Sequence, residues 1–366
     1  MAEVVVKYGI VGVGMMGREH MLNIAHLQGA ATVSCVADPH LPSQQSALNL
    51  AAKFGWSLKV FNRHQELLES GLCDAVIVSA PNMTHFHILM DIINHPRLHH
   101  ILVEKPLCTT VKDCKKVIDS ARRRPDIVVQ VGLEYRYMPA TAKLIDVVKS
   151  GKLGRVHMVA IREHRFPFLV KVNNWNRFNK NSGGTLVEKC CHFFDLMRLF
   201  VASNPVRVMA SGSIDVNHKD EVYDGKVPDI IDNAFVIIEF ENGSRGMLDL
   251  CMFAEGSKNE QEISVVGHIG KGEAFMPENI VRVGTRAAGG AGVETMKSED
   301  PRIRYDGLHH GASYLEHLNF LDAIKAQGRH TPAVDLEDGL YSVAMGVAAQ
   351  LSIEKGHFVT IKDVMD

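Results

Sequence analysis

The first 131 residues alternate between short apolar runs and longer stretches that have the hydrophobic spacing of helices. Runs rich in valine and isoleucine predict strands, and apolar residues that recur every three to four positions predict amphipathic helices. The predicted strands are 4–11, 32–37, 74–79, 101–104 and 127–131, and the predicted helices are 15–27, 43–54, 84–94 and 111–123. Strands that alternate with helices in this way favour a parallel, doubly wound (Rossmann) sheet.

The pattern changes after residue 131, where most predicted elements are strands separated by short turns. Helices are predicted at 141–149, 314–325 and 335–354, and strands at 155–164, 206–215, 231–241, 244–253 and 260–267. Turns such as Glu241-Asn242-Gly243 are typical of antiparallel hairpins. We therefore predict an α/β Rossmann domain at 1–131 and, at 132–366, an α+β domain with an open, largely antiparallel sheet. The glycine- and alanine-rich stretch 283–292 predicts a mobile loop.

Composition and charge exclude several classes of protein. The chain has 366 residues, of which 46% are hydrophobic and 22% charged, and 40 Lys+Arg against 42 Asp+Glu leave a net charge of −2. This balance argues against binding to nucleic acid. No apolar run reaches the roughly 18 residues of a membrane span, and no signal peptide is recognisable at the N-terminus. Seven scattered cysteines do not form a disulfide framework, which favours the cytoplasm.

A glycine-rich turn follows the first predicted strand and opens the first predicted helix. Gly12, Gly14 and Gly17 give the spacing G-x-G-x-x-G, and Asp38 lies 21 residues after Gly17, at the end of the next strand. Glycines at this spacing permit a tight turn and a close approach of pyrophosphate to a helix N-terminus, and the carboxylate suits a ribose hydroxyl. The motif predicts NAD binding, with NADP less favoured because its 2′-phosphate would be repelled by Asp38.

The stretch GGTLVEKCCHFFD, residues 183–195, carries a second candidate group. On a helix, Glu188, His192 and Asp195 would lie on neighbouring positions of one face. This arrangement leaves three interpretations: an acid/base site, a metal site, or an ordinary amphipathic helix. A metal is the weaker alternative, because Cys190, Cys191 and His192 are consecutive and would point in different directions. We predict no metal site.

Taken together, these segments resemble the glucose–fructose oxidoreductase / inositol dehydrogenase / rhizopine-catabolism (Gfo/Idh/MocA) family over nearly the whole chain. The resemblance rests on GVGMMG at 12–17, ADP at 37–39, APNMTH at 80–85, EKP at 104–106, GLEYRYMP at 132–139 and the 183–195 stretch. It implies a hydride transfer between a nicotinamide and a carbon that bears a hydroxyl group. Such a reaction needs a base for the hydroxyl proton and a positive group beside the developing alkoxide.

The resemblance implies roles for particular residues. Lys105 is expected to stabilise the alkoxide or transfer a proton, and His192 is expected to act as general base. Glu188 stands where the family usually has aspartate, so a longer side chain carries the carboxylate. Lys189 is expected to be a surface charge, and Asp195 a packing or orienting residue. The implied catalytic residues are thus Lys105, His192 and Glu188.

The resemblance also implies two binding sets. The cofactor-binding residues are Gly12, Gly14, Met15, Met16, Gly17, Asp38, Ala80, Pro81, Asn82, His85, Glu104 and Lys105. The substrate-binding residues are Lys105, Arg136, Tyr137, Trp175, Arg177, Glu188, His192 and His310. Polar and aromatic residues without a basic cluster favour a neutral, polyhydroxylated substrate.

Three functions follow as hypotheses. The first is an NAD(P)-dependent dehydrogenase of a cyclic polyol or sugar. The second is a redox-neutral NAD-dependent enzyme of the same fold that cleaves glycosides, and the third is a non-catalytic NAD-dependent regulator. The presence of both Lys105 and His192 argues against the third. We also expect a homodimer or homotetramer, because an open sheet in the second domain leaves one face to be covered.

Overall fold

The structure is a computed structural model that describes residues 5–326 and 332–366. The described chain divides into two compact units. The first contains 1–134, 171–173 and 302–340, and the second contains 135–170, 174–301 and 341–366, apart from the residues outside the described ranges. Residues 302–340, which follow the second unit's strands in sequence, thus group with the first unit, although we expected them in the second domain. Val4, at the start of the first predicted strand, lies outside the described residues.

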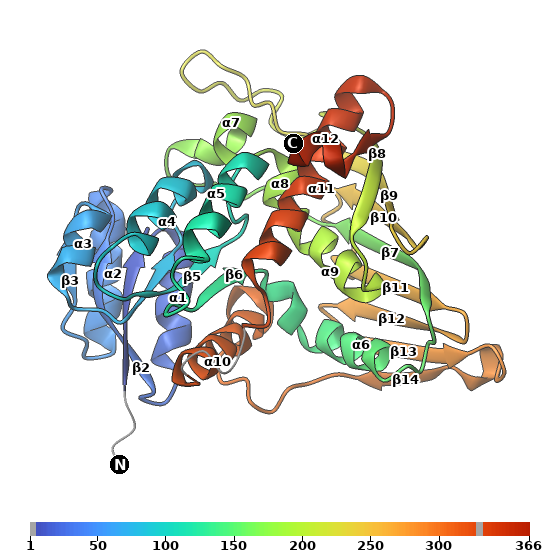
Figure 1. The fold of residues 1–366 in the computed structure, drawn as a ribbon, viewed down its shortest axis with the longest axis horizontal. Coiled ribbons are helices and arrows are strands. Elements are labelled where there is room, and N and C mark those ends of the chain that lie inside the picture. Colours follow the sequence, from blue (N-terminus) through green and yellow to red (C-terminus); the bar gives the residue numbers. More distant parts are fainter. Residues whose placement is uncertain (1–4, 327–331) are drawn as a thin grey trace. The chain divides into compact units, whose positions relative to one another are not determined.

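The first unit is built on a six-stranded parallel sheet with the order β3-β2-β1-β4-β5-β6 (Figure 1). Its strands are β1 (Val6–Val11), β2 (Ala31–Ala37), β3 (Lys59–Phe61), β4 (Ala75–Val78), β5 (His100–Glu104) and β6 (Val129–Gly132). Its helices include α1 (Met15–Ala25), α2 (Leu41–Lys53), α3 (His64–Ser70), α4 (His85–Ile93), α5 (Val111–Ala121) and α10 (Ala312–Lys325). The Rossmann prediction is confirmed, because β4 and β5 are buried apolar runs between helices.

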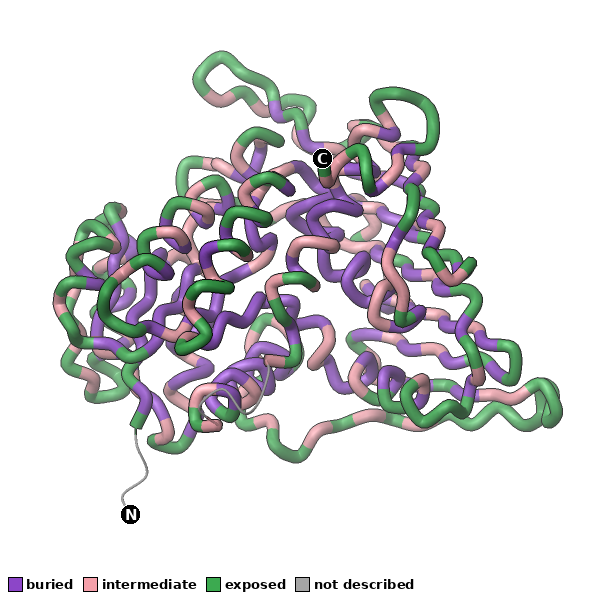
Figure 2. Tube along the Cα trace, in the orientation of Figure 1, coloured by how far each residue is buried: buried purple, intermediate pink, exposed green. Residues whose placement is uncertain are grey.

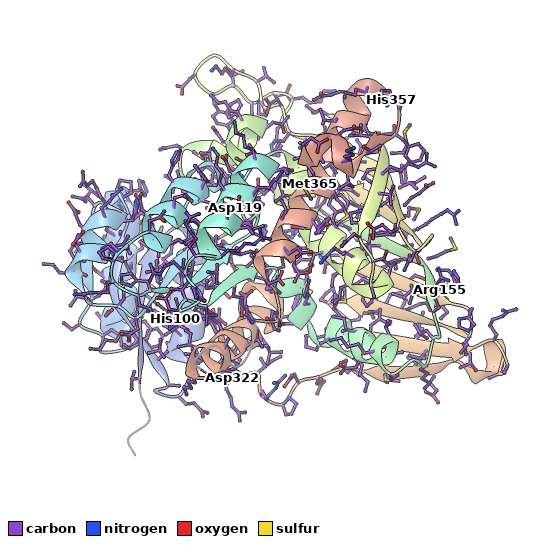
Figure 3. The ribbon with its side chains drawn as sticks, in the orientation of Figure 1. His100, Asp119, Arg155, Asp322, His357 and Met365 are labelled. Atoms are coloured by element: carbon purple, nitrogen blue, oxygen red, sulfur yellow. The ribbon has the colours of Figure 1, made fainter. Side chains whose placement is uncertain are left out.

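Helices cover this sheet as the doubly wound pattern requires. Helices α4 and α5 pack side by side, and α10 packs against α1. Asp119 lies on the exposed side of α5, and His100 begins β5, where its ring accepts a hydrogen bond from the Val128 N–H at 3.0 Å (Figure 3). From β1 the chain order runs to one edge of the sheet, through β2 to β3, and from β4 it runs to the other edge, through β5 to β6. Open α/β sheets bind ligands at such a switch point, at the carboxyl ends of the strands.

The second unit contains a nine-stranded sheet with the order β14-β13-β12-β11-β7-β10-β9-β8-β15. Its strands are β7 (Val156–His164), β8 (Pro205–Ser213), β9 (Asn233–Phe240), β10 (Arg245–Cys251), β11 (Gln261–Gly267), β12 (Gly270–Met276), β13 (Ile280–Thr285), β14 (Glu294–Lys297) and β15 (Val359–Thr360). Its helices are α6 (Pro139–Lys149), α7 (Asn179–Ser182), α8 (Thr185–Glu188), α9 (Cys191–Val201) and α12 (Ile361–Met365), while α11 (Leu336–Lys355) begins in the first unit. Short 3-10 helices of the described chain include η2 (Glu134–Tyr137), η3 (Val172–Arg177) and η5 (Gly307–His309).

The sheet of the second unit is largely antiparallel, as predicted, with one parallel pair between β7 and β10. Helix α9 packs on β7, and α6 packs on β12 and β13. Along β9 and β10, buried and more exposed residues alternate, and Figure 2 shows this alternation along the strands. One face of the sheet therefore belongs to the core, while the other carries exposed side chains.

Two predictions of local structure are wrong. The segment 183–195 is not one helix, because α8 ends at Glu188 and α9 begins at Cys191. The predicted loop 283–292 is too long by three residues, because residues 283–285 belong to β13, where Val283 is buried and pairs with Gly272 of β12, whereas residues 286–292 lie outside the strands. In the described part of the chain, no helix is long and apolar enough to cross a membrane.

Candidate active site

The glycine-rich turn between β1 and α1 has the geometry of a phosphate cradle. Gly12 has φ +87°, and a Cβ there would lie 2.6 Å from the Ala80 Cα, so no other residue fits without strain. A Cβ at Gly17 would collide with the Gly12 carbonyl oxygen, which shows how closely the helix packs on the turn. At Gly14, by contrast, an added Cβ would have no other heavy atom within 4 Å, so the N-terminus of α1 is open at this position. Met15 and Met16 form the first turn of α1. Backbone N–H groups at this end of the helix attract an anion, so the turn fits the pyrophosphate of a dinucleotide.

Asp38 follows β2, and its buried carboxylate is held by backbone groups. One oxygen accepts a hydrogen bond from the Val13 N–H at 2.8 Å, and the other accepts one from the His40 N–H at 2.8 Å. Because each carboxylate oxygen has two lone pairs, Asp38 keeps acceptor capacity for a ribose hydroxyl. The glycine-rich turn and the carboxylate are therefore fixed to one another through Val13.

His85, expected to bind the cofactor, is fully buried and contacts protein carbonyls. Its Nδ1 lies 2.9 Å from the Pro106 carbonyl oxygen, and its Nε2 lies 2.9 Å from the Ala80 carbonyl oxygen. Burial lowers the pKa of His85, so its neutral ring donates one hydrogen bond at a time. His85 thus ties the segment after β4 to the segment after β5. Its contact with cofactor stays a prediction, as do those of Pro81 and the buried Asn82.

Glu104 ends β5 and joins a buried chain of two histidines. Its Oε1 lies 2.9 Å from the His20 Nε2, and the His20 Nδ1 lies 3.0 Å from the His317 Nε2. Burial and the neighbouring His20 hold the pKa of His317 well below its ordinary value, so His317 is neutral. Burial raises the pKa of Glu104, but the hydrogen bond from His20 and the charge of Lys105 outweigh burial and lower it to about 2. We name Glu104, His20 and His317 the histidine relay.

A second buried carboxyl lies beside this relay on α10. Glu316 has a pKa raised well above the ordinary value by burial and by the charges of Glu134 and Glu104. Its surroundings therefore favour the protonated carboxyl over the carboxylate. His309, in η5, brings its Nε2 to 3.5 Å from the Glu134 Oε1. Lys105, directly after Glu104, is half-buried.

In the second unit, Glu188 and His192 lie on the two sides of a bend between short helices. Gly183 and Gly184 precede the bend with φ +87° and +84°, which favours glycine at both positions. The Gln350 side chain donates a hydrogen bond to the Gly183 carbonyl at 2.8 Å and fixes this turn. Glu188 is 6% exposed and His192 is 1% exposed. Two of the side chains predicted to carry chemistry, Glu188 and His192, thus lie buried at this corner.

Lys189, expected to be a surface charge, is buried, and that prediction is wrong. Its ammonium lies 2.8 Å from the Glu163 Oε1 and donates a hydrogen bond to the Tyr135 hydroxyl at 2.6 Å. The Gln261 side chain donates a hydrogen bond to the other oxygen of Glu163 at 2.8 Å. The Tyr135 ring in turn stacks on the His192 ring, with centroids 4.1 Å apart and planes 9° from parallel. We name Lys189, Glu163 and Tyr135 the lysine anchor.

The two arginines expected to bind substrate both form ion pairs within the second unit. Arg136 donates two hydrogen bonds to the buried Asp195, at 2.6 and 2.5 Å, and this pair attaches η2 to α9. Arg177 is buried and donates to Glu221 at 3.0 Å. These contacts give both arginines a structural role, and substrate contact by either stays a prediction.

The remaining predicted substrate residues differ in exposure. Tyr137 and Trp175 are half-buried, whereas His310 is exposed at the end of η5. Among the described residues, no group of three or more His, Cys, Asp or Glu side chains could hold a metal ion. The histidine relay and the lysine anchor were not predicted, since their members are far apart in sequence.

The fold and the dinucleotide cradle define a class, the Rossmann-type oxidoreductases. A family model described as "Oxidoreductase family, NAD-binding Rossmann fold" matches residues 6–133, and one described as "Oxidoreductase family, C-terminal alpha/beta domain" matches residues 145–361. The chain belongs to this Gfo/Idh/MocA oxidoreductase family, so the resemblance seen in the sequence is confirmed.

Relatives of known name match along the whole chain. A myo-inositol 2-dehydrogenase of Thermotoga maritima is 26% identical over 362 residues, covering 98% of this chain and 99% of the relative. The scyllo-inositol 2-dehydrogenase (NAD(+)) of Bacillus subtilis is 25% identical over 358 residues, covering 96% and 95%. The solved structure of a levoglucosan dehydrogenase in complex with NADH and levoglucosan shares the fold, with a TM-score of 0.84, 21% identity and coverage of 98% and 100%.

Proposed function

We propose that this protein is an NAD-dependent oxidoreductase that transfers a hydride between the nicotinamide and a hydroxyl-bearing carbon of a cyclic polyol or sugar. The observation that carries the proposal is the cradle of Gly12, Gly14 and Gly17 with the Asp38 carboxylate fixed beside it. Full-length relatives named for inositol oxidation support the substrate class.

Each group of residues then has a part in the reaction. Bound NAD supplies the hydride acceptor. The glycine turn holds its pyrophosphate, and Asp38 accepts hydrogen bonds from its ribose. His192 takes the hydroxyl proton, Lys105 stabilises the negative oxygen, and Glu188 binds a neighbouring hydroxyl. The corner that holds Glu188 and His192 is buried, which limits the access of water to the base.

We propose NAD rather than NADP as the cofactor. Both oxygens of Asp38 already accept backbone hydrogen bonds, so the carboxylate cannot turn away from a 2′-phosphate without losing them. Asp38→Ser removes this repulsion. We expect it to lower the ratio of kcat/KM for NAD to kcat/KM for NADP about tenfold or more, which corresponds to a free-energy difference of about 1.4 kcal/mol. An unchanged ratio would remove this role from Asp38.

We propose that the exposed face of the second unit's sheet joins copies of the chain into a dimer or tetramer. Phe235 is 62% and Ile237 46% exposed on β9, and Met247, paired with Ile237 from β10, is 42% exposed. Neighbouring apolar side chains on a sheet face are typical of an interface. Ile237→Lys should shift the sedimentation coefficient toward the monomer, whereas Val216→Lys, on an exposed loop, should not.

We propose the cytoplasm as the compartment, on the basis of the cysteines. All seven are free thiols, and six of them are buried. Disulfides would be the expected state of many cysteines in an oxidising compartment.

The test of the reaction is NADH formation by the purified protein with inositols, hexoses, pentoses and anhydrosugars. We expect one group of compounds to give NADH, and we expect Lys105→Ala and His192→Ala to lower kcat by at least about a hundredfold while NAD still binds. Near-normal kcat in either variant would return that residue to a structural role. Silence across the panel would contradict the dehydrogenase and favour the redox-neutral enzyme or the regulator.

A further inference from the structure

The charged lysine anchor lies under the proposed general base, inside the core of the second unit. Glu163 is fully buried and Lys189 is 5% exposed. Moving such a pair out of water costs several kcal/mol, and well-packed apolar residues in its place are often as stable or more stable. Stability alone therefore gives little reason for a lysine at position 189, three residues before His192.

The anchor reaches His192 through an aromatic ring. Tyr135 stacks face to face on the imidazole, at 4.1 Å between centroids and 9° between planes. Phe193 meets the same tyrosine ring edge-on, at 5.7 Å and 68°. The His192 ring therefore lies nearly parallel to the Tyr135 ring and contacts it across one face. Stacking uses the face of the imidazole, whereas its two nitrogens lie in the ring plane and are the atoms that accept a proton.

The position of Tyr135 depends in turn on Lys189. The ammonium donates to the tyrosine hydroxyl at 2.6 Å and lies 2.8 Å from Glu163, so Lys189 connects the tyrosine to β7. Glu163 itself is held on two sides. Gln261, its register partner on β11, donates to one oxygen at 2.8 Å, and Arg165 approaches the other at 3.6 Å. The sheet of the second unit thus fixes the tyrosine hydroxyl through two polar contacts.

We propose that Tyr135 and Lys189 are positioning residues for the general base. Tyr135 is the stacking platform that sets the plane of the His192 imidazole, and Lys189 is the tether that fixes the platform to Glu163. This inference rests on the proposed function, since it assigns His192 as the base. It adds two residues that were not among the predicted site residues.

Four variants separate the platform from the tether. Tyr135→Phe keeps the ring and removes the hydroxyl contact with Lys189, Lys189→Met removes the tether from the other side, and Tyr135→Leu removes the platform. We expect Tyr135→Phe and Lys189→Met each to lower kcat about tenfold, and the double variant to lower it no further, because both remove the hydrogen bond between Lys189 and the Tyr135 hydroxyl. Tyr135→Leu should lower kcat about a hundredfold, the order expected for a misplaced catalytic group.

Three readouts distinguish positioning from loss of structure. KM should stay within about threefold of wild type, and the solvent deuterium isotope effect on kcat should rise as proton transfer becomes slower. NAD binding and the melting temperature show whether the variant is folded. Lys180→Met, at an exposed lysine of α7, is the matched control and should behave as wild type. Wild-type kcat in Tyr135→Leu, or additive effects of Tyr135→Phe and Lys189→Met, would overturn the proposal.

A readout independent of turnover separates this proposal from the proposed function. Crystal structures should show the His192 side-chain torsion angles unchanged in the Lys180→Met control and shifted or divided between two conformers in Tyr135→Leu. If the wild type oxidises no compound but the torsion angles behave in this way, the proposed function fails while the positioning stands. If the wild type is active and His192 keeps its orientation in Tyr135→Leu, the positioning is wrong.

Discussion

The two units both bury a carboxylate beside a candidate catalytic residue, but they neutralise it differently. In the first unit, Glu104 precedes Lys105 and accepts a hydrogen bond from His20, whose other nitrogen meets the neutral His317. In the second unit, Glu163 pairs with Lys189, which carries a formal charge. The first network therefore depends on pH through the depressed pKa of Glu104, whereas the second is an ion pair that also holds the Tyr135 hydroxyl.

The largest expected effect comes from breaking the ion pair of the second unit. Glu163→Gln leaves the Lys189 ammonium buried beside an amide, and the free energy of unfolding should fall by about 3 kcal/mol. Urea unfolding measures this. The double variant Glu163→Gln/Lys189→Met removes both charges and should recover most of the loss. Equal destabilisation of the single and double variants would show that the pair matters only through packing.

A smaller and pH-dependent effect is expected in the histidine relay. The pKa of Glu104 is depressed from an ordinary 4.5 to about 2, so its contribution to stability is present above the ordinary value and is lost as pH falls toward about 2. His20→Leu removes the hydrogen bond to this carboxylate and should cost about 2 kcal/mol at neutral pH. The difference from wild type should shrink as the pH falls below 4.5.

Denaturant unfolding at a series of pH values tests this prediction. Glu163→Gln is the internal comparison, because its loss arises in the second unit and does not involve Glu104. A cost of His20→Leu that does not change with pH would contradict the account of Glu104 as an ionised group that depends on His20.

The smallest expected effect concerns Glu316, whose replacement should raise the stability of the protein, whereas the two replacements above lower it. Its folded pKa is raised, so the folded protein holds a proton that the unfolded chain releases, and stability falls as pH rises above the ordinary glutamate value. Glu316→Gln mimics the protonated form and should raise the melting temperature by a few °C, on the order of 1–2 kcal/mol, at neutral pH. The gain should vanish at acidic pH. Glu69→Gln, at an exposed glutamate of the same unit, is the control and should show no such trend.

The sequence predicts the first unit well because its signals are local. Except for the short β3, the strands from β1 to β6 are mainly apolar and buried, and the turn at Gly12 and Gly17 needs glycine for steric reasons. In the second unit the sheet was predicted in part. Strands β12 to β14 contain glycine and charged residues, and their partners rather than their composition make them strands.

The candidate site is harder to predict, because its supporting contacts join distant segments. His20 and His317 are brought together by the packing of α1 and α10, and Lys189 meets Glu163 because α9 packs on β7. The bend before His192 has no proline or glycine in it. Lys189 and Cys190 keep near-helical angles, with ψ of −44° and −7°, so a small change in ψ ends one helix and begins the next. Helical periodicity cannot detect such a change.

The central claim is that this protein moves a hydride between a polyol or sugar and NAD. The most direct measurement is to mix NAD-saturated protein with substrates deuterated at the carbons that bear hydroxyls, and to follow deuterium into the nicotinamide by mass spectrometry in a single turnover. The account predicts deuterium on the nicotinamide with at least one polyol or sugar, whether or not NADH is released, and its loss in His192→Ala. NAD that is bound but never labelled, across inositols, hexoses, pentoses and anhydrosugars, would contradict it.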